Sequence, residues 1–198
     1  MTNHEIARVL VNIADILEIQ EENLFKIRAY RKAADSVYHL DEDIRNLYQK
    51  DRIGDIPGVG KAVKAKIEEM LEKSSCEYYE GLLSQVPAGV LEMLTIPGIG
   101  HKTVKIIYEQ LGITSIAELV QAVNDKKIRT LPGMGEKSEY NIQKGIELLK
   151  ENTGKFNLGL ALPLAEEFLE YLMTSPDIEC GSIVGSIRRG KPLVSDID

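Results

Sequence analysis

IPGVG occupies residues 56–60, and two near copies follow it along the chain, IPGIG at 96–100 and LPGMG at 131–135. Each copy is preceded by a short helical pattern and followed by an amphipathic one: KAVKAKI, HKTVKII and EKSEYNI. One such pentapeptide predicts only a turn, because Pro and Gly mark turns in many folds. Three copies between helical patterns predict a mainly α chain with an internally repeated unit.

The two glycines of each copy suit contact with a phosphate. Glycine adopts positive φ freely and has no side chain to block an approaching backbone. The second glycine also opens a helix, whose free N–H groups and dipole favour an anion. The copies resemble helix-hairpin-helix motifs, which implies DNA binding at Gly58, Gly60, Gly98, Gly100, Gly133 and Gly135. For a single copy, a helix corner without a ligand stays an alternative.

The residue after the second glycine distinguishes the copies. Lys61 and Lys102 stand there in the first two and support phosphate binding. The third copy has Glu136 instead, followed by Lys137. Since a carboxylate repels a phosphate, we expect the third copy to bind DNA least well.

The region before the first copy predicts a compact helical bundle. Thr2 and Glu5 form a capping-box pattern ahead of apolar residues that recur at helical spacing up to Leu17. Similar patterns over 24–37 and 44–47 predict two further helices, and 63–71 predicts a fourth after the first IPGVG copy.

Charge is distributed unevenly along the chain. The formal net charge of −7 argues against a protein that coats nucleic acid indiscriminately, since such proteins carry a basic field overall. Basic residues nevertheless cluster at three places: Lys26, Arg28, Arg31 and Lys32; Lys61, Lys64 and Lys66; and Arg188, Arg189 and Lys191. Each cluster taken alone also fits a solvated helix face.

Composition bounds the class of protein. With 198 residues and 43% hydrophobic content, the chain is typical of soluble globular proteins. Cys76 and Cys180 are far apart in sequence, so neither a disulfide framework nor a thiolate metal site is expected. Charges interrupt the apolar stretches and no secretion signal is recognisable, so we expect a cytoplasmic protein with no membrane partner.

The pattern changes beyond residue 154. Another helical pattern covers 162–172, and SIVGSI and PLVSDID are typical of two β-strands around a turn, which predicts the start of an α/β domain. Alternation along the second strand would direct Asp196 and Asp198 to one face, as carboxylates that hold Mg²⁺ require. Gly185 and Ser186 suit contact with a polyphosphate, and Arg188 and Arg189 can neutralise its charge.

The stretch GSIRRGKPLVSDID at 185–198 resembles the nucleotidyltransferase signature of family X DNA polymerases. FKIRAYRKAA and IPGVGKAVKAKI are similar to the lyase domain of the β-type members, and the further LPGMG copy resembles bacterial or archaeal members. The resemblance covers the whole chain. It implies a helical lyase-like domain over 1–78, a helix-hairpin-helix DNA-binding subdomain over 79–154, and a truncated nucleotidyltransferase palm over 155–198. Many such bacterial enzymes carry a C-terminal PHP nuclease domain, which is absent here.

The resemblance also implies roles for single residues. In the palm, Asp196 and Asp198 would hold Mg²⁺ or Mn²⁺, and Gly185, Ser186 and Arg189 would contact the dNTP. The family's third metal-binding aspartate lies on a later strand, so this chain alone is expected not to polymerise DNA. The parent enzyme would fill gaps in DNA repair as a monomer, acting on gapped or nicked DNA with a 5′-phosphate.

Within the lyase-like domain, Lys66 matches the Schiff-base lysine, Lys26 a 5′-phosphate ligand and Tyr30 a residue of the same pocket. Arg28 and Lys64 add positive charge for DNA. Two positions depart from the β-type pattern, since Phe25 replaces a histidine and Ala62 replaces a phosphate-binding lysine. These departures make lyase activity a weaker expectation than phosphate binding.

Hairpin carbonyl groups in this family hold a monovalent cation. The resemblance implies Gly54, Ile56 and Val59 as its ligands in the first hairpin, and Leu94, Ile96 and Ile99 in the second. Two other kinds of protein stay open. A non-catalytic helix-hairpin-helix module of a repair nuclease or ligase leaves the C-terminal signature unexplained, and a nucleotidyltransferase acting on RNA ends or small molecules leaves the repeats unexplained.

Overall fold

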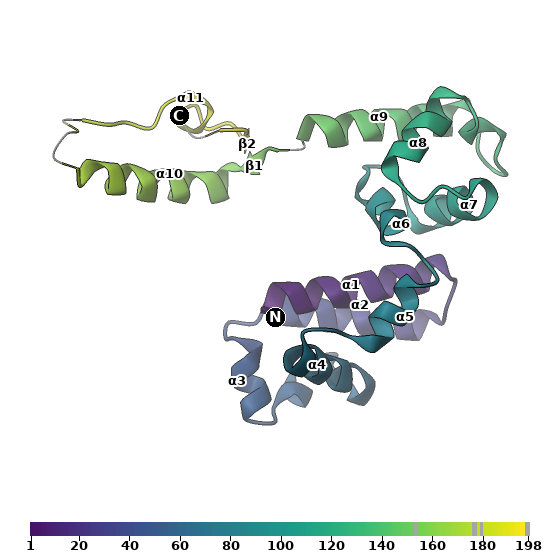
Figure 1. The fold of residues 1–198 in the computed structure, drawn as a ribbon, viewed down its shortest axis with the longest axis horizontal. Helices are drawn as coiled ribbons and strands as arrows, with labels where there is room; N and C mark the ends of the chain where they lie inside the picture. The colour runs from purple at the N-terminus through teal and green to yellow at the C-terminus, as the bar shows by residue number, and fades with distance from the viewer. Residues whose placement is uncertain (153, 176–177, 179, 197–198) are drawn as a thin grey trace. The chain divides into compact units, whose positions relative to one another are not determined.

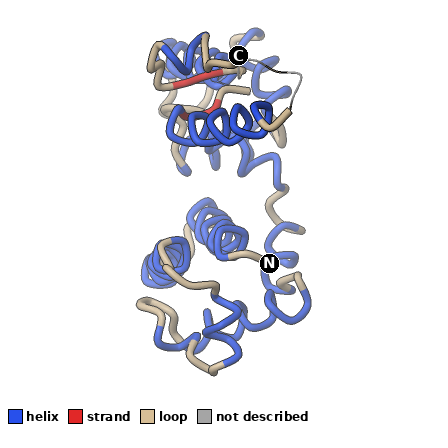
Figure 2. The backbone as a smooth tube through the Cα atoms, turned by 90° about the vertical axis from the view of Figure 1, so that its left-hand side faces the viewer, coloured by secondary structure: helices blue, strands red, loops and turns tan. Residues whose placement is uncertain are grey.

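The computed structural model describes residues 1–152, 154–175, 178 and 180–196. The chain divides into two compact units, Met1–Ile146 and Glu147–Asp198, which are considered separately below. Helices dominate both the ribbon and the backbone tube (Figures 1 and 2), which confirms the expected mainly α class. Within the described ranges, no helix is both long and apolar enough to cross a membrane.

An antiparallel helix pair forms the base of the first unit. Helix α1 (Asn3–Ile19) begins at the predicted capping box, in which the Thr2 hydroxyl accepts from the Glu5 amide and the Glu5 carboxylate accepts from the Thr2 amide. Its apolar face packs along α2 (Leu24–Tyr38). Both helices bury residues spaced three and four apart: Ile6, Leu10, Ile13 and Leu17 from α1, and Ile27, Ala34 and Val37 from α2.

The expected bundle is completed by α3 (Ile44–Gln49), the 3-10 turn η1 (Ile53–Asp55) and α4 (Lys61–Lys73), with α5 (Glu77–Leu83) following. Asn3 joins the start of α3 to that of α1, because its side-chain oxygen accepts from the Ile44 amide at 2.9 Å. Ile67 and Met70 of α4 are fully buried in the bundle. The first hairpin therefore connects η1 to a helix that belongs to the core.

The rest of the first unit holds the other two hairpins. Its elements are α6 (Ala88–Glu92), η2 (Met93–Thr95), α7 (His101–Leu111), α8 (Ile116–Asn124), η3 (Ile128–Thr130) and the part of α9 (Glu136–Asn152) up to Ile146. A Cβ built at Gly145 of α9 would lie 2.3 Å from the Pro97 carbonyl oxygen. Only glycine permits this approach, so the helix after the third hairpin packs directly on the second hairpin.

Two side chains of α7 join it to the C-terminal half of α1 and to the turn that follows α1. His101 Nε2 lies 2.9 Å from Asp15 Oδ1, and Lys105 Nζ lies 2.8 Å from Glu21 Oε2. Both side chains are about four-fifths buried, so these polar contacts are partly shielded from water. The helix that follows the second hairpin is therefore held by acidic residues of the bundle.

The second unit is small. Strands β1 (Phe156–Asn157) and β2 (Leu193–Val194) pair antiparallel, α10 (Leu158–Met173) packs against both strands, and the single turn α11 (Gly185–Arg188) packs on α10. Its core contains Ala161, Ala165, Ile187 and Val194. The prediction of a helix over 162–172 is confirmed.

The prediction that SIVGSI and PLVSDID form two paired strands is wrong for SIVGSI. Residues 182–184 form no strand, and Gly185 has φ +64°, which ends an extended conformation and starts the helical turn α11. Leu193 pairs instead with Asn157, across a two-residue ladder. Asp196 lies beyond this strand, and Asp198 lies outside the described residues.

Candidate nucleic-acid interface

The three hairpins share one backbone geometry. The first glycine of each has a left-handed φ, 84° at Gly58, 86° at Gly98 and 72° at Gly133. The same turn hydrogen bond closes each one: Val59 N–H to Ile56 O at 3.0 Å, Ile99 N–H to Ile96 O at 3.1 Å, and Met134 N–H to Leu131 O at 3.0 Å. Proline followed by a positive-φ glycine is the residue pair of a type II turn. The predicted repeat is thus confirmed as three equivalent turns.

Proline leaves one carbonyl group of each preceding 3-10 turn without its usual donor. A 3-10 helix bonds C=O of residue i to N–H of residue i+3, and Pro57 and Pro97 have no N–H to offer Gly54 and Leu94. In the described part of the chain, no hydrogen bond reaches either carbonyl oxygen. The hairpins therefore supply the kind of ligand, a carbonyl oxygen, that a hard cation prefers.

The helices after the first two hairpins begin without a side-chain cap. Gly60 and Gly100 are their N-cap residues, both extended, and neither has a side chain to accept from the first-turn amides. Such amides and the helix dipole together favour an anion. The start of each of these two helices therefore offers backbone amides that can bind a phosphate.

The lysines that follow these two N-cap glycines are accessible to a ligand. Lys61 and Lys102 are exposed, and across the described ranges neither takes part in an ion pair. Lys64 differs, because its Nζ donates to Asp51 Oδ1 at 2.7 Å, which raises the pKa of Lys64, and lies 3.6 Å from Glu68. Lys64, expected among the DNA-binding residues, is thus already neutralised by carboxylates.

Carboxylates fill the start of the third hairpin helix. Glu136 stands where the other hairpins have lysine, and its Oε1 accepts from Arg129 Nη1 at 2.7 Å. Glu139, only 4% exposed, accepts from both Nε (2.7 Å) and the backbone amide (3.0 Å) of Arg129. Burial alone raises the pKa of the Glu139 carboxyl, but these Arg129 hydrogen bonds outweigh it and hold the pKa below 4.5.

A second basic site surrounds one aromatic ring of the bundle. Lys66 Nζ lies 4.5 Å and Lys26 Nζ 5.5 Å from the ring centroid of Tyr78, on α5. Tyr30 is buried beside them, with its ring nearly parallel to that of Tyr78 and 6.3 Å away, and burial raises the pKa of its hydroxyl. The fold thus brings together the three residues expected of a lyase pocket.

Tyr78 was missed at the sequence level. It follows the loop after α4, where Tyr78 and Tyr79 stand side by side without a recognisable motif, and only the fold shows which of them faces the lysines. The Tyr78 hydroxyl raises the pKa of Lys26, which keeps that ammonium charged. Tyr79 instead accepts a hydrogen bond from Asn12 at 2.9 Å.

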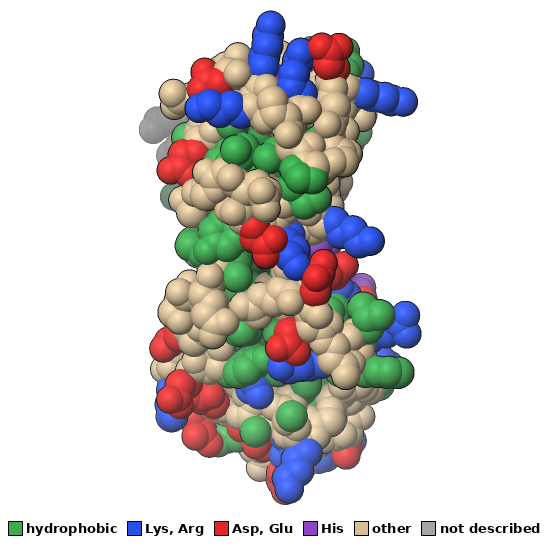
Figure 3. All heavy atoms as spheres, turned by 90° about the vertical axis from the view of Figure 1, so that its right-hand side faces the viewer, with side chains coloured by type: hydrophobic (Ala, Val, Ile, Leu, Met, Phe, Trp, Pro, Cys, Tyr) green, Lys and Arg blue, Asp and Glu red, His purple; other side chains and the backbone are tan. Residues whose placement is uncertain are grey.

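The remaining residues of the first basic cluster have separate surroundings. Arg28 is exposed, and Phe25 is 80% exposed. Arg31 is bound by Asp15 and Glu18 of α1. Acidic and basic side chains alternate over the face drawn in Figure 3, without a continuous basic field. Any nucleic-acid contact would therefore depend on local sites.

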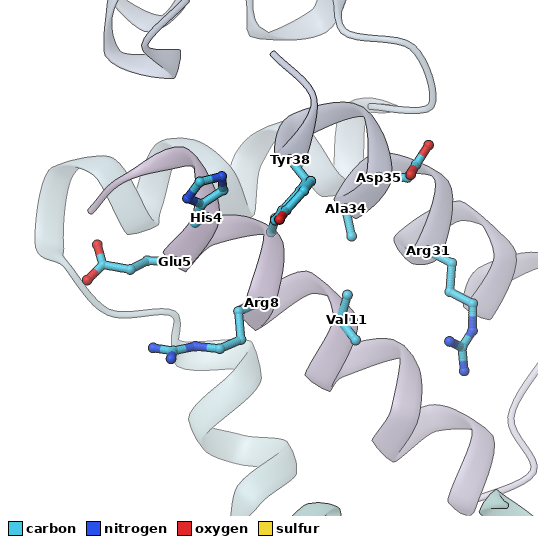
Figure 4. A pocket seen from close by; sticks show the side chains of 9 residues that line it. His4, Glu5, Arg8, Val11, Arg31, Ala34, Asp35 and Tyr38 are labelled. Carbon is cyan, nitrogen blue, oxygen red and sulfur yellow. The ribbon is translucent and has the colours of Figure 1, made fainter. Parts of the chain in front are cut away.

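One hollow of the bundle lies away from these sites. It has a volume of about 590 Å³, and the side chains of Val11 and Ala34 face each other across its floor, with Tyr38 and His4 at one end (Figure 4). None of the residues expected to bind DNA lines it.

The expected nucleotide residues lie in the second unit. Ser186 Oγ is buried and lacks a hydrogen-bond partner in the described structure, while Arg189 is exposed. Asp196 is exposed and accepts from the Ser195 hydroxyl at 3.4 Å. Among the described residues no cluster of His, Cys, Asp or Glu is suited to a metal ion, and Asp198 lies outside them.

Comparison with known proteins relates the chain to helix-hairpin-helix domains and to a DNA polymerase. Residues 1–76 match the helix-hairpin-helix domain family, and residues 90–147 match the SAM-like helix-hairpin-helix tandem family. The DNA polymerase/3'-5' exonuclease PolX of Bacillus subtilis (strain 168) is 33% identical over all 198 residues. The chain spans 34% of the length of that relative.

Proposed function

We propose, on the premise that this chain is homologous along its whole length to a family X DNA polymerase, that it grips gapped or nicked DNA for such an enzyme. The observation that carries the proposal is the pair of uncapped helix starts at Gly60 and Gly100, each beside a lysine that forms no ion pair within the described residues. Amide groups read the phosphate backbone and not the bases, so the grip is independent of sequence.

The lyase-like pocket gives the grip a preference for a 5′-phosphate. Lys26 carries a firm positive charge, and Arg28 is exposed on the same helix. Lys61 lies at the first hairpin and Lys66 follows on the same helix, whereas Lys64 between them is already paired with Asp51. A terminal phosphate has more negative charge than an internal one, so this group of cations binds it preferentially.

A monovalent cation fits the first two hairpins. Across the described ranges no donor reaches the Gly54 and Leu94 carbonyl oxygens, and the carbonyl oxygens of Ile56, Val59, Ile96 and Ile99 belong to the same two turns. The cation would neutralise the turn carbonyls and add positive charge beside the DNA phosphate. The protein's own contribution is the proline that leaves a carbonyl group free.

Lys66 is our candidate for a 5′-deoxyribose-phosphate lyase nucleophile. Its neutral amine would attack the aldehyde carbon of an abasic sugar, and the resulting carbinolamine would take up one proton and lose water to give an iminium ion. Lys66 lines a cavity of about 620 Å³ together with Tyr78 and Glu69, which gives room for a sugar phosphate.

The second unit is proposed as the start of a nucleotidyltransferase palm. Ser186 Oγ, buried without a partner, is suited to a phosphate oxygen, with Gly185 and Arg189 beside it. Asp196 and Asp198 are the proposed Mg²⁺ or Mn²⁺ ligands of the whole enzyme. On α10, Leu160, Leu164, Phe168 and Tyr171 are exposed along one side, and this apolar stripe favours packing against further palm elements. The domain limits 1–78, 79–154 and 155–198 belong to the same proposal.

The proposal is tested by binding of the chain to one-nucleotide-gapped duplexes that differ only in a 5′-phosphate or 5′-hydroxyl. Fluorescence anisotropy across a salt series should show tighter binding to the gap with a 5′-phosphate than to the gap with a 5′-hydroxyl. Binding to an intact duplex should be the weakest of the three. Each phosphate neutralised adds about one unit to the log–log salt slope. Equal affinities for the three duplexes at every salt concentration would disprove the proposed specificity.

The lyase assignment needs its own test. Borohydride reduction with a DNA abasic site should trap a covalent adduct at Lys66, and Lys66→Ala should lose it while Lys50→Ala, an exposed α3-end lysine, should not. No adduct in the unmutated chain would refute the lyase and leave the DNA grip standing.

A further inference from the structure

The Tyr78 ring is the point at which two ammonium groups converge. Lys26 from α2 and Lys66 from α4 both lie within 5.5 Å of its centroid, although the two lysines are 40 positions apart in sequence. Lys66 Nζ also donates to the Ala62 carbonyl oxygen at 3.3 Å. In the described structure Lys66 has no carboxylate partner, so the ring and one carbonyl are its neighbouring electron-rich groups.

We propose that Tyr78 is a positioning residue that holds the Lys66 nitrogen at the mouth of its cavity, both as the ammonium and as the iminium formed there. The proposal rests on the lyase function proposed above and names the residue that supports its nucleophile. Tyr78 is suited to this because its ring lines the same cavity as Lys66.

The charge on Lys66 explains why an aromatic ring fits. A lysine ammonium that condenses with an aldehyde gives an iminium ion and one water molecule, and the single positive charge stays on the same nitrogen. The negative face of a ring attracts that charge before and after the reaction. Glu69 and Glu77 line the same cavity, but within the described residues neither is paired with Lys66, and Glu69 is paired with Lys73.

The contact with the Tyr78 ring also distinguishes Lys66 from the other lysines of the bundle. Lys61 is exposed and has no aromatic neighbour, so its amine samples many positions. Lys26 lies a further 1 Å from the ring centroid than Lys66 does, and it is not a lining residue of the cavity. Loss of the ring should therefore redistribute aldehyde adducts among these lysines.

The first experiment compares Tyr78→Phe, which keeps the ring, with Tyr78→Leu, which removes it. Borohydride-trapped adducts with abasic-site DNA are mapped by peptide mass spectrometry. We expect Tyr78→Phe to behave as the unmutated chain, and Tyr78→Leu to lose about two- to five-fold of the Lys66 adduct with a larger share at other lysines. Tyr140→Leu, at a 62%-exposed tyrosine of α9, is the control. An unchanged adduct pattern in Tyr78→Leu overturns the proposal.

The second experiment needs no lyase activity, so the two proposals can fail separately. Competitive labelling with acetic anhydride reports how freely each lysine reacts with a small reagent. Relative to Lys61, Lys66 should label about two- to five-fold faster in Tyr78→Leu and unchanged in Tyr78→Phe. Equal labelling of Lys66 in all three proteins, with melting temperatures that show intact folds, overturns the positioning role even if the unmutated chain forms no adduct.

Discussion

The first and second hairpins differ from the third in side-chain charge while all three share one turn. Gly58, Gly98 and Gly133 adopt the same left-handed conformation, and the same hydrogen bond closes each turn. The helix after the third turn nevertheless starts with Glu136, which Arg129 binds. Pro-Gly therefore determines the backbone conformation of the hairpin, whereas the residue after the second glycine determines whether the helix start can bind an anion.

The third hairpin has a structural role of its own. Arg129 and the buried Glu139 fix its helix start, and Gly145 of the same helix contacts the second hairpin. The third hairpin thus supports the second, and the second is expected to bind DNA. Four predictions follow from this division, in decreasing order of effect.

Gly145→Ala should have the largest effect, because its Cβ would lie 2.3 Å from the Pro97 carbonyl oxygen. We expect a loss of about 1–3 kcal/mol in the free energy of unfolding. Gly81→Ala is the matched control, since no atom lies within 4 Å of its added Cβ and alanine favours helix α5. Urea denaturation measures both variants. Equal stability of the two would show that the third hairpin helix does not pack on the second hairpin.

Reversing charge at the second hairpin should weaken DNA binding next most strongly. Lys102→Glu places a carboxylate beside the Gly100 amides, as Glu136 does at the third hairpin. We expect roughly a tenfold loss of affinity for gapped DNA at low salt and a smaller salt slope. Lys127→Glu, at a lysine paired with Asp125, is the control. If both variants bind equally well, the second hairpin is not a phosphate site.

Glu139→Gln should change how stability depends on pH. The folded-state pKa of this carboxyl lies below 4.5, so the charged form stabilises the fold above pH 4.5 and the contribution is lost as pH falls through the lowered pKa. The variant should lose on the order of 1 kcal/mol near pH 7 and less at lower pH. Denaturation curves at pH 7, 5 and 3 test this. A constant difference across them would contradict the Arg129 pairing.

Glu136→Lys should give the smallest change, because it converts the third hairpin to the pattern of the other two without adding a new turn. We expect a gain of about threefold in affinity for gapped DNA and a steeper salt dependence. Arg129 keeps its bonds to Glu139. A loss of affinity would indicate that Glu136 supports the DNA-binding form in some other way.

Local patterns were enough to predict much of the fold. The capping box of α1, the helices of the bundle and the three turns all depend on residues close in sequence, and all were predicted correctly. The strand prediction at SIVGSI failed because β2 pairs with β1, which lies 37 positions away, and short apolar runs do not identify a distant partner.

The candidate site could be predicted only in part, namely for the residues that lie in local sequence motifs. Lys26, Tyr30 and Lys66 were found through their motifs, and the structure brings them together. Tyr78 was missed because its role arises from the packing of α5. The neutralisation of Lys64 by Asp51 was also missed, since ion pairs between exposed residues have no sequence signature.

The most direct test of the central claim is the amide NMR spectrum of the ¹⁵N-labelled chain, titrated with gapped DNA that carries a 5′-phosphate. We expect the largest chemical-shift changes at the first-turn amides of α4 and α7, among them Lys61 and Lys102. The first-turn amides of α9, among them Glu136, should change little. The shifts at Lys61 should diminish when the phosphate is replaced by a hydroxyl. Shifts as large at Glu136 as at Lys61 and Lys102 would contradict the division between the hairpins.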